Sequence, residues 1–198
     1  MKTVVGFLSR AHGFSVLSSL IDSKNYRILR IYTHSLNPKS QDPTRSKRND
    51  FDLFVKKCQK NNIDLISIDS KEQKINDFPD CDYIIEVSWR YLIPVQITRK
   101  ARIGAFGIHR GKLPDYAGAE PIKQAINGGE KEIVISSHYL DPVIDAGGVI
   151  CVRSHPINYN PNHSLEENIQ RLRDEITRFF PELVFKTVKV LEGNQQLY

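Results

Sequence analysis

The sequence predicts an α/β fold, with a mostly parallel central sheet and helices on both of its faces. Short apolar runs suited to buried strands alternate along the chain with segments whose apolar residues recur at helical spacing. The 198 residues are enough for one domain with a full core, and 40% hydrophobic with 26% charged residues are ordinary globular values. We therefore expect a single domain over residues 1–198.

The first half of the chain provides four of the expected strands, at residues 3–8, 26–33, 63–68 and 83–87. The helices expected between them cover residues 14–21, 49–61 and, as a short helix, 71–78. Ser46 or Asn49 is the expected N-cap of the second helix. The polar segment 34–47 is a long loop, and the basic stretch Lys39–Arg48 is expected to be solvated.

The second half provides strands at residues 103–108, 133–139 and 149–152. After two prolines, the sequence Ser164-Leu-Glu-Glu167 has the pattern of a capping box that opens a helix. Its apolar residues then recur at spacings of four, three and four. Pro181 is expected in the first turn of a following helix or at a kink.

The composition excludes several classes of protein. No apolar run reaches the roughly 18 residues that a membrane span needs, and the N-terminus lacks a signal-peptide cleavage site, so we expect a cytoplasmic protein. Cys58, Cys81 and Cys151 are scattered without C-x-x-C spacing, which predicts core residues and neither a disulfide framework nor a metal site. The net charge of +5 permits an anionic partner.

Two ionisable residues stand at strand ends in the central stretch 103–150. His109 follows an apolar strand, and Asp145 lies in a turn that follows another strand and continues as Ala146-Gly147-Gly148. Ligands of open α/β sheets bind at the carboxyl ends of the strands, so an imidazole and a carboxylate placed there can meet. On spacing alone the two residues are a candidate acid/base pair, with a structural role for His109 as the alternative. His138, within a strand, is expected to have a supporting role at most.

The turn after the first strand, Ser9-Arg-Ala-His-Gly13, opens a helix. It lacks G-x-G-x-x-G, so a dinucleotide site is not indicated. Arg10 and His12 are nevertheless candidates for contact with an anion at the helix N-terminus, with ordinary surface roles as the alternative.

The central motifs resemble those of the 10-formyltetrahydrofolate-dependent formyltransferases. They are Gly107-Ile-His109, Lys112-Leu-Pro114, Ala117-Gly-Ala-Glu-Pro121, His138 and Asp145-Ala-Gly147. The 36 positions that separate His109 from Asp145 agree with the spacing of that family. The segment Ser88-Trp-Arg-Tyr-Leu-Ile-Pro94 is similar to the family's folate-side loop. The resemblance covers about residues 80–157, and the earlier part of the chain only in layout.

This resemblance implies a Rossmann-like three-layer fold and formyl transfer from 10-formyltetrahydrofolate to a primary amine. His109 would assist attack on the formyl carbon and stabilise the tetrahedral intermediate, and Asp145 would relay the amine proton. The residues expected to bind the folate are Ser88, Trp89, Arg90, Tyr91, Leu92, Leu140, Asp141, Val143 and Ile144. Those expected to bind the acceptor are Arg10, His12, Lys112, Gly118, Glu120 and Pro121.

One departure from the family pattern concerns Gly107, where the family has an asparagine whose amide would donate to the formyl oxygen. The loss of one such donor typically costs 100- to 1000-fold in rate, so restoring it as Gly107→Asn is expected to raise the rate. Hydrolysis of 10-formyltetrahydrofolate and folate or nucleotide binding with weak turnover therefore stay open. So does a basic RNA-binding module, although no aromatic platform supports it.

The acceptor is not fixed by any residue. The glycinamide ribonucleotide branch carries a Gly-rich loop that this chain lacks, and the methionyl-tRNA branch carries a C-terminal barrel domain, for which this chain is expected to be too short. The segments at 90–94 and 117–121 look more like the tRNA and amino-sugar branches, so a nucleotide-linked amino sugar is narrowly favoured. A homodimer is compatible with the sequence.

Overall fold

The computed structural model describes residues 1–195 as two compact units. The first comprises Met1–Tyr91 with Gln96–Ala105, and the second comprises Leu92–Val95 with the residues from Phe106 onward. Strand β5 (Ala101–His109) gives its first half to one unit and its second half to the other. The strands are hydrogen-bonded in the order β3-β2-β1-β4-β5-β6-β7.

The first unit is a parallel α/β arrangement, as the sequence predicts. Its strands are β1 (Lys2–Leu8), β2 (Tyr26–Thr33), β3 (Asp64–Ser67) and β4 (Cys81–Val87). β1 pairs in parallel with both β2 and β4, and β2 pairs in parallel with β3. The helices α1 (Arg10–Ser23) and α2 (Phe51–Lys60) make the crossovers that parallel neighbours require, and α3 (Val95–Thr98) precedes β5.

Strand β1 is covered on both of its faces. Its residues Val4–Leu8 are all buried, although successive side chains point to opposite sides of a strand. Helix α1 packs against β1, β2 and β4. The Phe7 ring stacks on Tyr32 and Phe78, with centroids 4.8 and 6.0 Å away. The prediction of a buried strand at residues 3–8 is therefore correct.

Two local predictions in this unit are wrong. Residues 71–78 form a turn followed by irregular backbone and not a helix; Asp77 has a φ of 50°, and Phe78 packs onto Tyr32 with centroids 5.7 Å apart. The N-cap of α2 is Asp50, not Ser46 or Asn49. The Asp50 carboxylate makes no side-chain cap bond because it pairs with Arg48.

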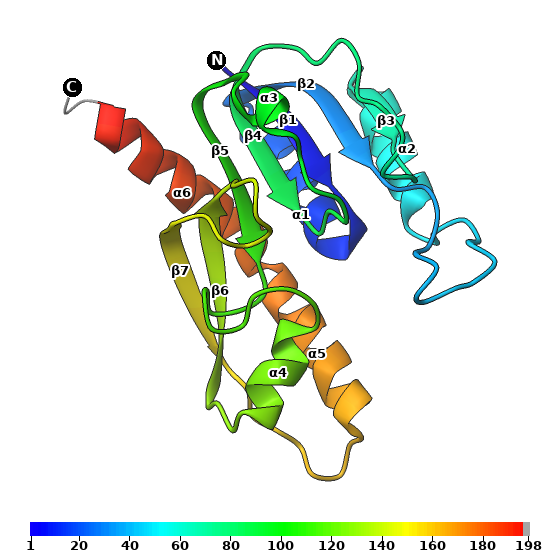
Figure 1. Cartoon of the computed structure of the whole chain (residues 1–198), viewed down its shortest axis with the longest axis vertical. Helices are drawn as coiled ribbons and strands as arrows, with labels where there is room; N and C mark the ends of the chain where they lie inside the picture. The colour runs from blue at the N-terminus through cyan, green and yellow to red at the C-terminus, as the bar shows by residue number, and fades with distance from the viewer. Residues whose placement is uncertain (196–198) are drawn as a thin grey trace. The chain divides into compact units, whose positions relative to one another are not determined.

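The second unit combines an antiparallel sheet with helices (Figure 1). Its strands β6 (Glu132–Tyr139) and β7 (Val149–Pro156) pair with each other, and β6 also pairs with β5. The turn between β6 and β7 is too short for a crossover connection, so the strands run antiparallel. Helix α6 (Phe179–Gln195) packs against both, and α4 (Pro121–Asn127) packs against β6 and α5 (Leu165–Thr177).

The helical predictions in this unit are confirmed. Ser164 caps α5 in a reciprocal capping box with Glu167. Pro181 lies in the first turn of α6. The three cysteines are buried and free, as expected. The predicted α/β fold is thus correct, with antiparallel pairing at β5, β6 and β7. Among residues 1–195, no helix has both the length and the apolar character needed to cross a membrane.

Candidate active site

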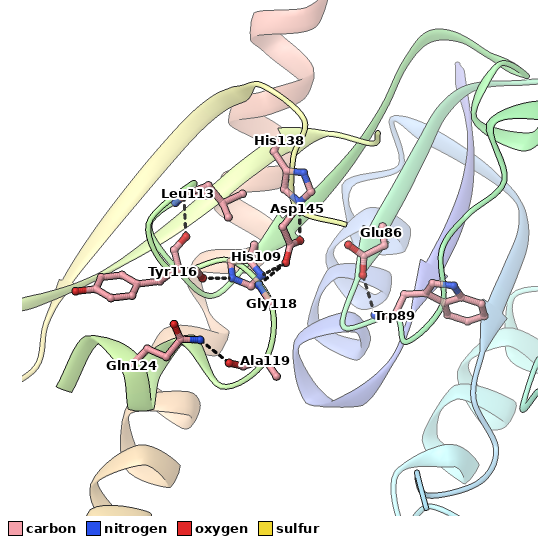
Figure 2. Close-up of polar contacts among 12 residues, drawn as sticks. Glu86, Trp89, His109, Leu113, Tyr116, Gly118, Ala119, Gln124, His138 and Asp145 are labelled. Carbon is pink, nitrogen blue, oxygen red and sulfur yellow. Dashed lines mark hydrogen bonds and ion pairs between the residues drawn. The ribbon is translucent and has the colours of Figure 1, made fainter. Parts of the chain in front are cut away.

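The structure brings His109 and Asp145 together within the second unit. Nδ1 of His109 lies 3.3 Å from Oδ2 of Asp145, and the two side chains are only 11% and 13% exposed. His109 ends β5, and Asp145 stands in the turn between β6 and β7 (Figure 2). An imidazole and a carboxylate that are far apart in the chain therefore share one partly buried place.

The pairing of β5 with β6 adds a second imidazole to this place. Gly107 lies opposite His138, and His109 lies opposite Ser136. Because alternate residues of a strand share a face, His109 and His138 project from the same side of the sheet. Nε2 of His138 lies 3.6 Å from Oδ1 of Asp145, so the carboxylate has a histidine near each oxygen.

The loop after β5 holds the far side of the His109 ring. The main-chain carbonyl of Tyr116 accepts a hydrogen bond of 2.7 Å from Nε2 of His109. Ser136 fixes the start of this loop, because its hydroxyl donates to the Gly111 carbonyl and accepts from the Leu113 amide. A Cβ at Gly111 would lie 2.5 Å from the Tyr116 carbonyl oxygen, so no larger residue fits there.

The turn that carries Asp145 is held by backbone contacts. Asp145 has a φ of 56°, and its Oδ2 accepts a 2.9 Å hydrogen bond from the Gly118 amide. A Cβ at Gly147 would lie 1.8 Å from the carbonyl oxygen of Tyr139. The backbone therefore approaches closely behind the acid, and it does so at Gly147.

These contacts fix the protons of the pair. A carbonyl oxygen only accepts hydrogen bonds, so Nε2 of His109 must carry a hydrogen. Burial lowers the pKa of His109, while the Asp145 charge and the Tyr116 carbonyl oppose that shift. In the neutral ring, the Nδ1 lone pair therefore faces the carboxylate. The resting pair is one proton short, which suits it to accept a proton.

The residues predicted to bind the folate at 88–91 belong to the first unit. The Trp89 indole stacks on the His34 ring with centroids 4.1 Å apart, and its amide donates to Glu86. The Arg90 amide donates to Nε2 of His34, and the Tyr91 hydroxyl donates to the Asp69 carbonyl. These residues are thereby anchored to the ends of β2, β3 and β4.

Arg48 is a correction to the predicted solvated loop, because only 3% of it is exposed. Its guanidinium donates to the Ser9 hydroxyl and the His34 carbonyl and pairs with Asp50. Burial lowers the pKa of Arg90, and the charges of Arg10 and Arg48 lower it further. The first unit therefore gathers three guanidinium groups near the ends of β1, β2 and β4.

The other predicted binding residues are placed as follows. In the first unit, Arg10 opens α1 and donates to Gln41, His12 is buried in α1, and Ser88 has a φ of 58°. In the second unit, Lys112 pairs with Asp115, Glu120 is the N-cap of α4, and Pro121 is its buried first residue. Leu92, Asp141, Val143 and Ile144 are exposed, and Leu140 is half-buried.

Sequence reasoning missed the contact of His138 with Asp145, the role of the Tyr116 carbonyl and the burial of Arg48. The His138 contact had a signal, since a histidine on the strand opposite His109 shares its face when the register places it there. A main-chain carbonyl leaves no trace in residue identity. Within residues 1–195, no cluster of three or more His, Cys, Asp or Glu side chains could hold a metal ion.

Comparison with known proteins adds a family signal. Residues 6–184 match the sequence profile of the formyl transferase family. The chain is 32% identical over 117 residues to the methionyl-tRNA formyltransferase of Chlorobium phaeovibrioides, a match that covers 59% of this chain and 34% of that protein. It is 22% identical over 206 residues to that of Pediococcus pentosaceus, covering 99% of this chain and 60% of the relative.

Solved structures show the same fold. The phosphoribosylglycinamide formyltransferase of Bacillus halodurans superposes with a TM-score of 0.69 at 15% identity, covering 100% of this chain and 97% of that one. The two curated relatives are much longer than this chain, which spans 34% and 60% of their lengths.

Proposed function

We propose that this chain, which belongs to the formyl transferase family, transfers a formyl group from 10-formyltetrahydrofolate to a primary amine. The observation that carries the proposal is the 3.3 Å contact between Nδ1 of His109 and Oδ2 of Asp145. In the resting pair neither of these two atoms carries a proton, so the pair can accept one. Formyl transfer needs such a group, because the attacking amine must lose a proton as its nitrogen bonds to the formyl carbon.

The bound folate would supply the formyl carbon and a nitrogen leaving group. Asp145 accepts the amine proton, His109 shares it through Nδ1, and the proton then passes through Asp145 to the folate nitrogen that leaves the formyl carbon. Once protonated on both nitrogens, His109 is an imidazolium close to the developing oxyanion, which it stabilises electrostatically. The Tyr116 carbonyl keeps the ring oriented throughout, because it holds the Nε2 hydrogen.

For the donor, we propose contacts with Leu92 and residues 140–144, which belong to the second unit. The exposed apolar side chains of Val143 and Ile144 directly precede Asp145 in the sequence and offer a surface for an aromatic ring system. In the first unit, Trp89 and Tyr91 present aromatic groups that are fixed by His34 and Asp69.

For the acceptor, a nucleotide-linked amino sugar is our finer proposal. Its support is the likeness of the segments at 90–94 and 117–121 to the amino-sugar branch, and the net charge of +5, which permits an anionic partner. The curated relatives are named for methionyl-tRNA, so that acceptor belongs in the same test.

The test incubates the protein with 10-formyltetrahydrofolate and a panel of amines that includes nucleotide-linked amino sugars, glycinamide ribonucleotide and methionyl-tRNA. We expect a formylated amine and stoichiometric tetrahydrofolate. Release of formate without any amine would replace transfer by hydrolysis. Tight folate binding with no turnover would make the protein a binder, and no folate binding would overturn the proposal.

A further inference from the structure

His138 is the least exposed titratable side chain at the candidate site, and one of its nitrogens lacks a hydrogen-bond partner. The side chain is 4% exposed. Its Nδ1 lies 3.0 Å from the carbonyl oxygen of Tyr139, whereas its Nε2 is buried and has no hydrogen bond. An unsatisfied buried nitrogen is costly to maintain, so its presence needs an explanation.

The tautomer of His138 follows from its partners. The Tyr139 carbonyl can only accept, so Nδ1 carries the hydrogen, and Nε2 of the neutral ring presents a lone pair. This lone pair faces Oδ1 of Asp145 at 3.6 Å. The contact is attractive only when a proton is present on one of the two atoms, as is also true of His109 on the other oxygen.

We propose that His138 is the third member of a proton relay and acts through Asp145. The amine proton that reaches the carboxylate of Asp145 is shared between Nδ1 of His109 and Nε2 of His138, and it leaves through Asp145 to the nitrogen that departs from the formyl carbon. The amine loses one proton and the leaving nitrogen gains one, so no other reactant is needed. This proposal rests on the formyl transfer proposed above.

The charges around His138 allow it to hold one proton but not to be charged together with His109. Burial lowers the pKa of His138, the Asp145 carboxylate raises it, and a charged His109 lowers it. These two groups are the titratable neighbours that act on the ring. A single proton is therefore shared among three groups, and it titrates as a property of the cluster.

The first test compares His138→Gln with His155→Gln in steady-state formyl transfer. Glutamine keeps a hydrogen-bonding group near Nε2 but cannot hold a proton. We expect kcat of His138→Gln to fall on the order of 100-fold with KM little changed. His155 is the matched control, because it is a histidine of the same unit whose Nε2 pairs with Glu175, away from Asp145. It should keep full activity. Wild-type kcat in His138→Gln would overturn the relay.

The second test uses the wild-type protein without substrate, so it does not depend on whether a variant folds. Nitrogen-15 NMR of the wild-type protein should show His138 with a hydrogen on Nδ1 and none on Nε2 at neutral pH. On acidification, His109 and His138 should titrate with common midpoints. A hydrogen on Nε2 of resting His138, or independent midpoints, would contradict the relay. Because no formyl donor is involved, these results stand apart from any failure of the proposed function.

Discussion

His34 in the first unit and His109 in the second are both buried imidazoles that stand at the ends of strands, but their partners differ. His34 donates from Nδ1 to the Ile68 carbonyl and accepts at Nε2 from the Arg90 amide. His109 faces an acceptor on each side, the Tyr116 carbonyl and the Asp145 carboxylate. A neutral ring satisfies both partners of His34. At His109 it satisfies only the Tyr116 carbonyl, and a further proton would be needed between Nδ1 and Asp145.

The pKa shifts follow this difference. Burial, followed by the Arg90 charge, lowers the pKa of His34 to about 3, so this ring stays neutral at physiological pH. Burial also lowers the pKa of His109, but the Asp145 charge is the largest opposing effect there. The comparison teaches that burial alone does not distinguish a structural histidine from a chemical one. The chemistry of the two partners does.

The largest expected effect separates the two histidines by function. His109→Ala should lower kcat about 1000-fold, because it removes the group that shares the proton. Its free energy of unfolding should change by only about 1–2 kcal/mol, since one hydrogen bond is lost. Assays of kcat and urea denaturation measure both. A His109→Ala protein that stays active would show that His109 has no chemical role and does not differ from His34 in this respect.

His34→Ala should lower stability more than His109→Ala does and affect kcat less. It leaves the Ile68 carbonyl and the Arg90 amide without partners, which should cost about 2–4 kcal/mol of stability. The folded fraction should keep its kcat, and any change in activity should appear in KM, because the Trp89 ring loses its stacking partner. An unchanged free energy of unfolding would show that His34 is not structural.

The turn that presents Asp145 offers a paired test in neighbouring glycines. Gly147→Ala places a Cβ 1.8 Å from the Tyr139 carbonyl oxygen, so the backbone must move. We expect a loss of about 1–3 kcal/mol of stability and a fall in kcat, because Asp145 moves with the turn. Gly148→Ala is the control, since its nearest neighbour would lie 3.9 Å away. Equal effects from the two variants would refute the proposed role of the turn.

A pH titration of stability tests the neutral His34. Its pKa is 6.5 unfolded and about 3 folded, so between these values the unfolded chain binds a proton that the folded chain does not. The contribution of neutral His34 to the free energy of unfolding is fully present above pH 6.5. It is lost by about 1.4 kcal/mol per pH unit as the pH drops toward 3. His34→Gln lacks this term, so its stability should fall less steeply. If urea denaturation gives the wild type and His34→Gln the same dependence of the free energy of unfolding on pH, His34 is not a neutral ring with a lowered pKa.

The smallest expected effect concerns Gly107. An asparagine there would stand on the same face as His109, two residues away, and its amide could donate to the formyl oxygen. We expect Gly107→Asn to raise kcat on the order of tenfold, less than a full oxyanion donor contributes because the site has not adapted to it. A fall in kcat would mean that another group already fills that space.

Sequence reasoning could predict most of the fold, because strands and helices depend on local apolar patterns. Strands β1, β2 and β4 were predicted from apolar runs, and Ser164 from its capping box. The helix predicted at residues 71–78 does not form, and Phe78 at the end of this segment packs on Tyr32. Such a contact depends on partners that are distant in the sequence.

The candidate site was predictable only in part. Glycines behind Asp145 and the strand ahead of His109 indicated that the two would meet. The contact of His138 with the same carboxylate depends on the register of β5 with β6, which no local pattern fixes. Arg48 looked solvated because it ends a basic run, yet its hydrogen bonds to Ser9 and His34 bury it.

The central claim is that Asp145 carries the amine proton during formyl transfer. Asparagine tolerates the positive φ of this position, so Asp145→Asn should preserve the fold while removing the charge. With 10-formyltetrahydrofolate and the amine that the wild type formylates, single-turnover transfer by Asp145→Asn should fall on the order of 1000-fold. Transfer within a few-fold of the wild-type rate would contradict the account.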